Sequence, residues 1–312
     1  MRPKRALLGT LTAAILAGLV PSVGVPFTAR GDDREDGITH AFLATGGETY
    51  IRDGQGEITW RYPHQTRDGW VLPDGHILLA LSKSPSYPGG GVIEVHLDGK
   101  VVFEYRGTQS EVNTVQKLDD GRYLISEAGD RPRLLEVQHD GRIVTEVRLK
   151  AQTRNHHLQT RMARKLPNGH YLVPQLLDKV VREYTPEGEV VWEVKTPDMP
   201  FTAIRLSDGH TLIGCTVGNL VIEVDRDGKT VWSVDNDDLP GKTINDACGV
   251  QRLPNGNTVI TSYQAKGHEV KLQEITSEKK LVWIHRDSTS PGIHHFQLLD
   301  TNGRAIEGTP LR

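Results

Sequence analysis

The fold is decided by Arg252-Leu253-Pro254-Asn255-Gly256-Asn257-Thr258, in which a leucine leads directly into a short polar turn that ends in glycine. The same turn recurs along the chain, with one looser copy that carries an extra residue: Leu72–Gly75, Leu118–Gly121, Leu166–Gly169, Leu206–Gly209 and Leu299–Gly303. Successive leucines stand 46, 48, 40, 47 and 46 residues apart. A period of this length is typical of an array built from one repeated supersecondary unit.

Each period contains the parts of a four-stranded antiparallel sheet. A β-rich run such as His210–Gly214 follows the turn, and a further run such as Val221–Val224 comes after a loop of variable length. A tight turn such as Asp227-Gly228 then reverses the chain into a fourth run, and Asp-Gly between β-rich runs is a strong hairpin signal. Four strands per period predict one blade of a β-propeller, with strands A to D running outward from the axis.

Three residue types recur with the same period. An aromatic ring lies four residues after the glycine or lysine of the second turn, at Trp60, Phe103, Trp192, Trp232 and Trp283. A glutamate lies five residues before that same turn residue, at Glu94, Glu136, Glu183, Glu223 and Glu274. A basic residue precedes four of the turn leucines, at Lys117, Lys165, Arg205 and Arg252. The recurrence favours packing between blades over ligand stacking for the rings, and structural pairing over catalysis for the charges.

The two ends of the repeat array complement each other. Ala41–Tyr62 has the pattern of strands B, C and D without a strand A, and His294–Gly303 has a strand A without a blade after it. Five full blades lie between these fragments. The sequence therefore predicts an all-β, six-bladed β-propeller over residues 40–312, closed by a C-terminal strand A that pairs with the N-terminal strands B to D. Closure of this kind leaves no open sheet edge.

The first 30 residues predict a signal peptide or an N-terminal anchor rather than part of the fold. Arg2, Lys4 and Arg5 precede an uncharged apolar run, Ala6–Val20, which is short for a membrane span. Residues 31–39 are expected to form a flexible lead-in. The protein is expected to be periplasmic or secreted. Attachment to a membrane is expected only through an uncleaved N-terminal segment.

Composition narrows the partners and the role of the cysteines. The formal net charge is −3 and both signs are interspersed, so a nucleic-acid partner is not expected. Two cysteines, Cys215 and Cys248, fall in neighbouring blades. A disulfide between them is geometrically conceivable, but two buried thiols are favoured, and neither cysteine has a further ligand at the spacing of a zinc site.

Candidate functional residues come from the segments that lead into each strand A, because these segments converge on one face around the axis. Four of the thirteen histidines lie there as two pairs, and the segments are rich in polar side chains. The candidate catalytic residues are His294, His295, His156, His157 and Arg161. The candidate ligand-binding residues are Arg67, Asp68, Glu111, Asn113, Arg154, Asn245 and Asp246.

Several chemistries are compatible with these residues. The histidines could serve as nucleophile or general acid and base while arginines hold an anion. The two histidine pairs lie half a turn apart in a six-bladed ring, which disfavours one compact shell of metal ligands, and no metal site is assigned. Alternatively, each histidine could bond backbone groups in a long loop between blades.

A family resemblance is carried by three stretches. Arg252–Thr258 and Glu223–Trp232 resemble the repeats of PQQ-like propellers, and together with His294–Leu299 they most resemble bacterial arylsulfotransferase-type propellers. The resemblance implies a histidine on the axis as the acceptor of a sulfuryl group, here His294 or His295, assisted by His156, His157 and Arg161. It does not imply the quinone, because the vicinal cysteine pair and acidic metal cluster of the quinone-dependent dehydrogenases are missing from the sequence.

Three hypotheses follow, and the cofactor is left unassigned. The first is an exported propeller that binds a small molecule or a protein partner at the mouth of its axis without catalysis. The second is an arylsulfotransferase-like enzyme, and the third is a metal-dependent hydrolase or lactonase of the six-bladed type.

Overall fold

A computed structural model describes residues 37–288 and 290–312. The expected signal or anchor segment, residues 1–30, and the first part of the expected lead-in, residues 31–36, lie outside the described residues. No helix among the described residues is long and apolar enough to span a membrane.

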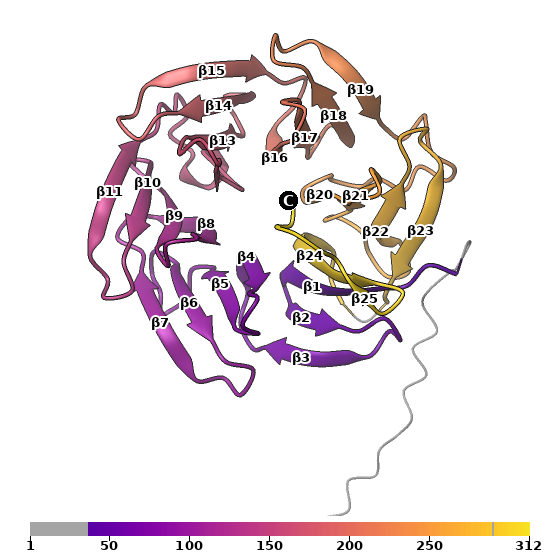
Figure 1. Ribbon diagram of the computed structural model, residues 1–312, viewed down its shortest axis with the longest axis horizontal. Coiled ribbons are helices and arrows are strands. Elements are labelled where there is room, and N and C mark those ends of the chain that lie inside the picture. The colour runs from indigo at the N-terminus through magenta and orange to yellow at the C-terminus, as the bar shows by residue number, and fades with distance from the viewer. Residues whose placement is uncertain (1–36, 289) are drawn as a thin grey trace, which may run out of the picture. The chain divides into compact units, whose positions relative to one another are not determined.

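The described chain forms six antiparallel sheets arranged as blades around one axis (Figure 1). Five sheets hold four consecutive strands each, and each inner strand is followed outward by the next three. The five blades are β4 (Thr66–Val71), β5 (Ile77–Leu81), β6 (Gly91–Val95) and β7 (Val101–Arg106); β8 (Glu111–Lys117), β9 (Tyr123–Ala128), β10 (Arg133–Val137) and β11 (Ile143–Arg148); β12 (Arg164–Lys165), β13 (Tyr171–Gln175), β14 (Val180–Tyr184) and β15 (Val190–Lys195); β16 (Pro200–Arg205), β17 (Thr211–Cys215), β18 (Leu220–Val224) and β19 (Thr230–Val234); and β20 (Val250–Arg252), β21 (Thr258–Thr261), β22 (Val270–Ile275) and β23 (Leu281–Arg286).

The sixth blade closes the ring from both ends of the chain. Its inner strand β24 (Ile293–Thr301) pairs antiparallel with β1 (His40–Gly46), which continues outward to β2 (Thr49–Arg52) and β3 (Ile58–Tyr62). A short strand β25 (Arg304–Ala305) pairs with the end of β24. The all-β class, the six blades and the closure by a C-terminal strand A are confirmed.

The last residues of the expected lead-in are attached to this blade. The backbone N–H of Thr39 donates to the side-chain oxygen of Asn302 at 2.8 Å, and Asn302 donates its own N–H to the carbonyl of Thr39 at 2.9 Å. Ile38 packs against the apolar cluster of the closing blade. The folded unit therefore begins slightly earlier than residue 40.

The recurring charges link each blade to its neighbour. The basic residue at the end of one strand A reaches the glutamate of the preceding blade, with distances of 2.7 Å for Lys117–Glu94, 2.9 Å for Arg205–Glu183 and 2.8 Å for Arg252–Glu223. Lys165 and Glu136 form the same pair. The charges recur in the sequence because four successive joints between blades use the same contact.

Two of these contacts bring three potential metal ligands together, Asp74, His76 and Glu94 in one blade and Asp208, His210 and Glu223 in another. In both, the glutamate already pairs with the lysine or arginine of the next blade. The histidine also donates to it from within the same blade, at 2.9 Å in each case. The clusters are thus accounted for by the joint between blades.

The recurring tryptophans also join neighbouring blades. The indole N–H of Trp60 donates to the carbonyl of Leu97 at 3.1 Å, that of Trp192 to Arg226 at 2.8 Å, and that of Trp232 to Ser277 at 2.8 Å. Each acceptor lies in the outer turn of the following blade. Burial differs along the series, because Trp283 is fully buried whereas Trp232 is partly exposed.

Candidate functional site

The candidate site lies where the six inner strands begin. Every strand A runs from one face of the propeller, which we call the start face, to the other, which we call the turn face because the Leu-x-x-Gly turns lie there. Since the strands of a blade alternate in direction, the loops between strands B and C and the connections between blades also lie at the start face. These segments carry most of the predicted site residues.

One residue from each blade forms what we call the axial ring. Each member stands five residues before the leucine of its turn: Arg67, Asn113, Arg161, Phe201, Cys248 and His294. At Arg67, Asn113 and Phe201 the pairing of strand A with strand B skips one residue, and the pairing of β24 with β1 skips His294. A residue skipped in this way is a β-bulge, which redirects a side chain out of the sheet pattern.

Contacts among the members show that the ring converges. The rings of Phe201 and His294 meet edge to face with centroids 4.5 Å apart, and the guanidinium carbon of Arg161 lies 5.9 Å from the Phe201 centroid. His294 Nδ1 lies 3.2 Å from the backbone carbonyl oxygen of Arg67. Residues that are far apart in sequence are thus brought to one point on the axis.

Several polar atoms of the axial ring are buried and have no hydrogen-bond partner among the described residues. They are both amide atoms of Asn113 and the Nε atoms of Arg67 and Arg161. A buried donor or acceptor without a partner costs about 1–3 kcal/mol. Three members of the axial ring thus hold buried polar atoms that could still accept or donate a hydrogen bond.

The geometry fixes the state of His294. A carbonyl oxygen only accepts hydrogen bonds, so Nδ1 must carry the proton that it shares with Arg67. Burial, with the positive charges of Arg161 and Arg67, holds the pKa of His294 well below its ordinary value of 6.5. The ring is therefore neutral at neutral pH, and its Nε2 atom carries a lone pair.

Glu111 organises the polar side of the site. His157 Nδ1 donates to its carboxylate at 3.1 Å, and Lys83 and Arg67 lie 3.2 and 3.7 Å from it. Burial alone would raise the pKa of Glu111, but the His157 hydrogen bond and the nearby arginines lower it to about 2. The carboxylate is therefore charged and held in place.

Arg161 is the buried cation of the site. Its Nη1 donates to the carbonyl of Thr160 at 2.8 Å, and its Nη2 lies 3.3 Å from His157 Nε2. Burial and the neighbouring Arg67 lower the pKa of Arg161 to about 10, so the guanidinium remains protonated at neutral pH. Arg67 and Arg161 carry two positive charges and Glu111 carries one negative charge, so the buried part of the site has a net positive charge.

The opposite side of the site is apolar. Phe201 and Cys248 pack in a cluster with Met162 and Leu176, and the partly buried Leu158, Met199 and Tyr263 lie against it. Tyr263 meets the edge of His294 with ring centroids 4.9 Å apart. Leu177 and Val217, in two adjacent loops of the start face, are exposed. A polar arc and an apolar arc thus face each other across the axis.

Contacts in the structure bring together five of the predicted residues, Arg67, Glu111, His157, Arg161 and His294. Asn113 occupies the corresponding bulged position of its own inner strand. Others lie apart from this group. His156 Nδ1 shares a hydrogen bond of 2.7 Å with Ser110 Oγ, and its Nε2 lies 3.1 Å from the carboxylate of Asp130. Arg154 and Asn245 are exposed in the loops. Asp246 lies beside Thr216 and Cys248, where burial raises its pKa.

Asp68 and His295 directly follow two members of the axial ring, Arg67 and His294, but they do not belong to the ring themselves. Both are fully buried, and they lie 3.8 Å apart. Asp68 pairs with Arg164 at 2.8 Å. Because neighbouring residues of a strand point in opposite directions, His294 and His295 belong to two different environments.

Sequence reasoning missed Phe201, Tyr263 and Lys83 as members of the site. Phe201 could have been found from its spacing, because it stands five residues before Leu206, as Arg67 does before Leu72. Tyr263 and Lys83 come from loops between strands B and C, which vary in length and carry no repeated signal.

Both cysteines are free, buried thiols, as the sequence favours. Burial raises the pKa of Cys215 to about 12, and that of Cys248 well above its ordinary value. Neither thiol is therefore poised as a nucleophile.

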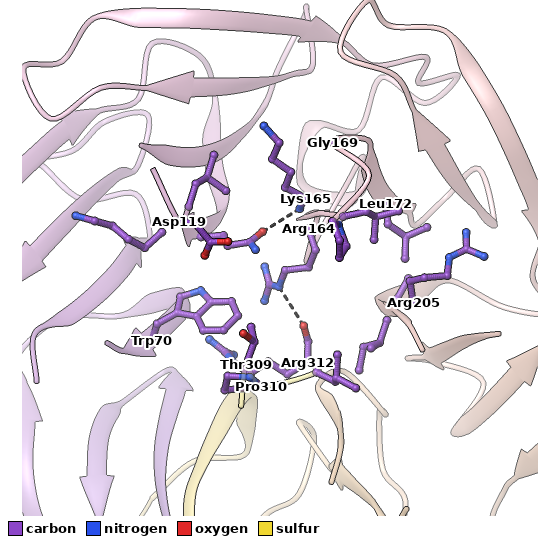
Figure 2. A pocket seen from close by; sticks show the side chains of 18 of the residues that line it. Trp70, Asp119, Arg164, Lys165, Gly169, Leu172, Arg205, Thr309, Pro310 and Arg312 are labelled. Carbon is purple, nitrogen blue, oxygen red and sulfur yellow. Dashed lines mark hydrogen bonds between the residues drawn. The ribbon is translucent and has the colours of Figure 1, made fainter. Parts of the chain in front are cut away.

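A cavity of about 460 Å³ lies at the other end of the axis, at the turn face (Figure 2). It is bordered by Trp70, Arg164 and Leu172, by the turns that contain Asp119 and Gly169, and by the tail Thr309–Arg312. It does not contain the polar and apolar arcs of the start face.

The chain matches no protein-family model and no curated protein. Among solved structures it is similar to a protein of unknown function from Bacteroides caccae, with 25% identity and a TM-score of 0.73 over 83% of this chain and 98% of that one. It is also similar to virginiamycin B lyase from Staphylococcus aureus, solved as a catalytically inactive His-to-Ala variant with quinupristin, with 14% identity and a TM-score of 0.58 over 83% and 92% of the two chains. The WD40 β-propeller domain of Doa1 has 14% identity and a TM-score of 0.54 over 85% and 86%. These similarities agree with the propeller fold and assign no activity.

Proposed function

We propose that this protein is an exported propeller that binds a small organic anion at the start face. The anionic group is held by Arg67, Arg161 and Asn113, and the apolar body of the ligand lies against Phe201, Met199 and Tyr263. The observation that carries the proposal is the set of buried, unpartnered polar atoms in the axial ring. Export rests on the N-terminal sequence pattern alone.

The charges support an anion rather than a cation. Two buried or half-buried guanidinium groups lie at the site, and Glu111, the nearest carboxylate, is already bound by His157, Lys83 and Arg67. The two arginines would repel a metal cation, and the carboxylate of Glu111 is already paired. Guanidinium groups and a primary amide offer N–H donors that suit the oxygens of a sulfate, phosphate or carboxylate group.

The binding test compares a buried arginine with an exposed one. Titration with 4-nitrophenyl sulfate, followed by calorimetry, should show binding to the wild-type chain. Arg161→Met should weaken it about 30- to 1,000-fold, as expected when a buried charged partner is lost. Arg154→Met, at an exposed position of the adjoining loop, should change the affinity less than about threefold. Equal effects of the two variants, with folding verified by circular dichroism, would refute this site.

A second candidate function, sulfuryl transfer, is favoured by the neutral His294 ring, whose Nδ1 is held by the Arg67 carbonyl. Its Nε2 lone pair would attack the sulfur of an aryl sulfate, forming an N–S bond as the bond from sulfur to the aryl oxygen breaks and a phenolate leaves. Attack by the oxygen of a second phenol on that sulfur would then break the N–S bond and restore the neutral ring, and the proton of this phenol would pass to the phenolate released in the first step. The resemblance to arylsulfotransferase-type propellers agrees with this chemistry.

Turnover separates the two candidate functions. If the protein is a transferase, the wild-type chain should release 4-nitrophenol from 4-nitrophenyl sulfate when phenol is present as acceptor, and His294→Ala should lower the rate at least about 100-fold. His156→Ala serves as the control, because His156 faces Ser110 and Asp130 instead of the axis. Binding without any release of 4-nitrophenol would leave the binding function and exclude this transfer.

A further inference from the structure

The tail of the described chain lies on the axis at the turn face. After β25 the chain turns inward, and the position of its last residue is marked at the centre of the ring in Figure 1. Leu311 pairs with the inner strand β20, because the N–H of Arg252 donates to its carbonyl at 2.9 Å. Arg164 Nε donates to the carbonyl of Arg312 at 3.0 Å (Figure 2). One backbone contact and one side-chain contact, from two different blades, therefore hold the backbone of this segment.

The side chain of Arg312 is fully buried, and both of its terminal nitrogens have acceptors. Its Nη1 donates to the carbonyl of Phe296 at 2.8 Å and to His295 Nδ1, and its Nη2 donates to the carbonyl of Gly69 and lies 3.4 Å from Asp68. The guanidinium carbon lies 3.8 Å from the centre of the Trp70 ring. A carboxylate, two carbonyls and an aromatic face are the groups that recognise a guanidinium.

The surroundings are built into the inner strands rather than supplied by the tail. Asp68 is fixed by Arg164 at 2.8 Å and accepts the backbone N–H of Gly69 at 2.9 Å. A Cβ atom on Gly69 would lie 2.8 Å from a methyl group of Leu79 and 2.9 Å from that of Thr45, so a larger residue here would force both side chains to move. The indole N–H of Trp70 donates to the carbonyl of Val115 in the next blade at 2.6 Å.

We propose that the turn-face end of the axis is an arginine-binding site, formed by Asp68, Trp70, His295 and the carbonyls of Gly69 and Phe296, which the chain fills with its own Arg312. The site recognises the guanidinium group by its planar pattern of donors. It lies beyond the axial ring and is independent of the organic anion proposed there. By occupying it, the tail forms one wall of the turn-face cavity and ties β24, the strand of His294, to β4.

The experiment removes the Arg312 side chain and then adds its guanidinium group as a free small molecule. Arg312→Ala, made in the full chain, should lower the thermal midpoint by about 5–10 °C, because Asp68 and the two carbonyls lose a buried partner. Millimolar N-ethylguanidinium should raise the midpoint of this variant, and calorimetry should show one site with a dissociation constant of roughly 1–10 mM.

Three controls make the result specific. Ethylammonium, which has the charge without the fork of donors, should bind Arg312→Ala at least about tenfold more weakly. The wild-type chain should not bind N-ethylguanidinium, since its own arginine fills the site. In a chain that carries both Asp68→Asn and Arg312→Ala, N-ethylguanidinium should no longer raise the thermal midpoint. Rescue of equal size by both cations, or binding of equal strength to the wild type, would overturn the proposal.

A measurement on the wild-type chain covers the case in which Arg312→Ala does not fold. The guanidinium protons of Arg312, observed by NMR, should exchange with solvent far more slowly than those of the exposed Arg154. Exchange at the rate of Arg154 would place Arg312 in solvent and would refute the arginine-binding site.

Discussion

A chain that lacks residues 293–312 should lose its cooperative unfolding transition altogether. The deletion removes β24, whose register covers the whole length of β1, from His40 paired with Thr301 to Gly46 paired with Ile293. It also removes Ile293, Phe296 and Leu298, which are buried in the apolar cluster of the closing blade. The loss should exceed the roughly 5–15 kcal/mol that stabilises a typical domain. Thermal and urea unfolding, followed by circular dichroism, test this expectation.

Contacts around the axis explain why the effect should spread beyond one blade. The side chain of Gln251 accepts the N–H of Leu298 at 2.9 Å, and that of Gln297 accepts the N–H of Val71 at 2.9 Å. Removing β24 therefore releases both of its neighbours and exposes the edge of β1. Open edges of this kind pair with other chains, so aggregation should accompany the loss.

One shorter deletion and one added peptide control for the size of the deletion. A chain that lacks residues 306–312 keeps β24 and β25 and should still unfold cooperatively, at a lower midpoint because Arg312 is gone. A synthetic peptide of residues 293–312, added to the longer deletion, should restore protease resistance. An unchanged thermal midpoint after deletion of 293–312 would contradict closure by this strand.

The blade architecture was predictable because its signals are local and repeated. Each Leu-x-x-Gly turn sets the direction of two strands within a few residues, and every period repeats the pattern. The pairs between Glu223 and Arg252, or between Glu94 and Lys117, follow the same logic, since identical joints between blades require identical residues. The missing strand A at one end and the surplus strand at the other then fix the closure.

The candidate site was predictable in part. The sequence places polar residues at the beginning of the inner strands, but it treats His294 and His295 as one pair. In the structure, a β-bulge at His294 directs that side chain to the axial ring, while His295 lies against Asp68 and Arg312. Which residue of a strand is skipped depends on packing against the neighbouring blades, and the strand's own sequence does not encode this directly.

The tail shows a different limit. Thr309–Arg312 contains no periodic pattern, and its place on the axis results from contacts with Arg164 and Arg252, residues that are remote in sequence. Burial of Arg312 depends on acceptors from two further strands. A contact set of this kind arises from the closed ring, so it becomes visible only once the ring is assembled.

Acid should destabilise the protein well above the range in which carboxylates titrate. Burial, followed by nearby arginines, holds the pKa of both His294 and His295 well below 6.5 in the folded state. In the unfolded chain both histidines would regain ordinary values and bind protons below about pH 6.5. The unfolded state then holds more protons than the folded state, so stability rises with pH in this window and is lost as pH falls through it. Each histidine contributes about 1.4 kcal/mol per pH unit.

The expected loss of stability grows as the pH falls below 6.5. Both histidines then take up protons in the unfolded chain before they do so in the folded protein, so the free energy of unfolding should fall with pH. Urea unfolding at several pH values measures this slope. His294→Gln and His295→Gln should each remove about half of it, because glutamine does not titrate. A wild-type slope near zero between pH 6.5 and 4.5 would show that both histidines can take up protons in the folded protein.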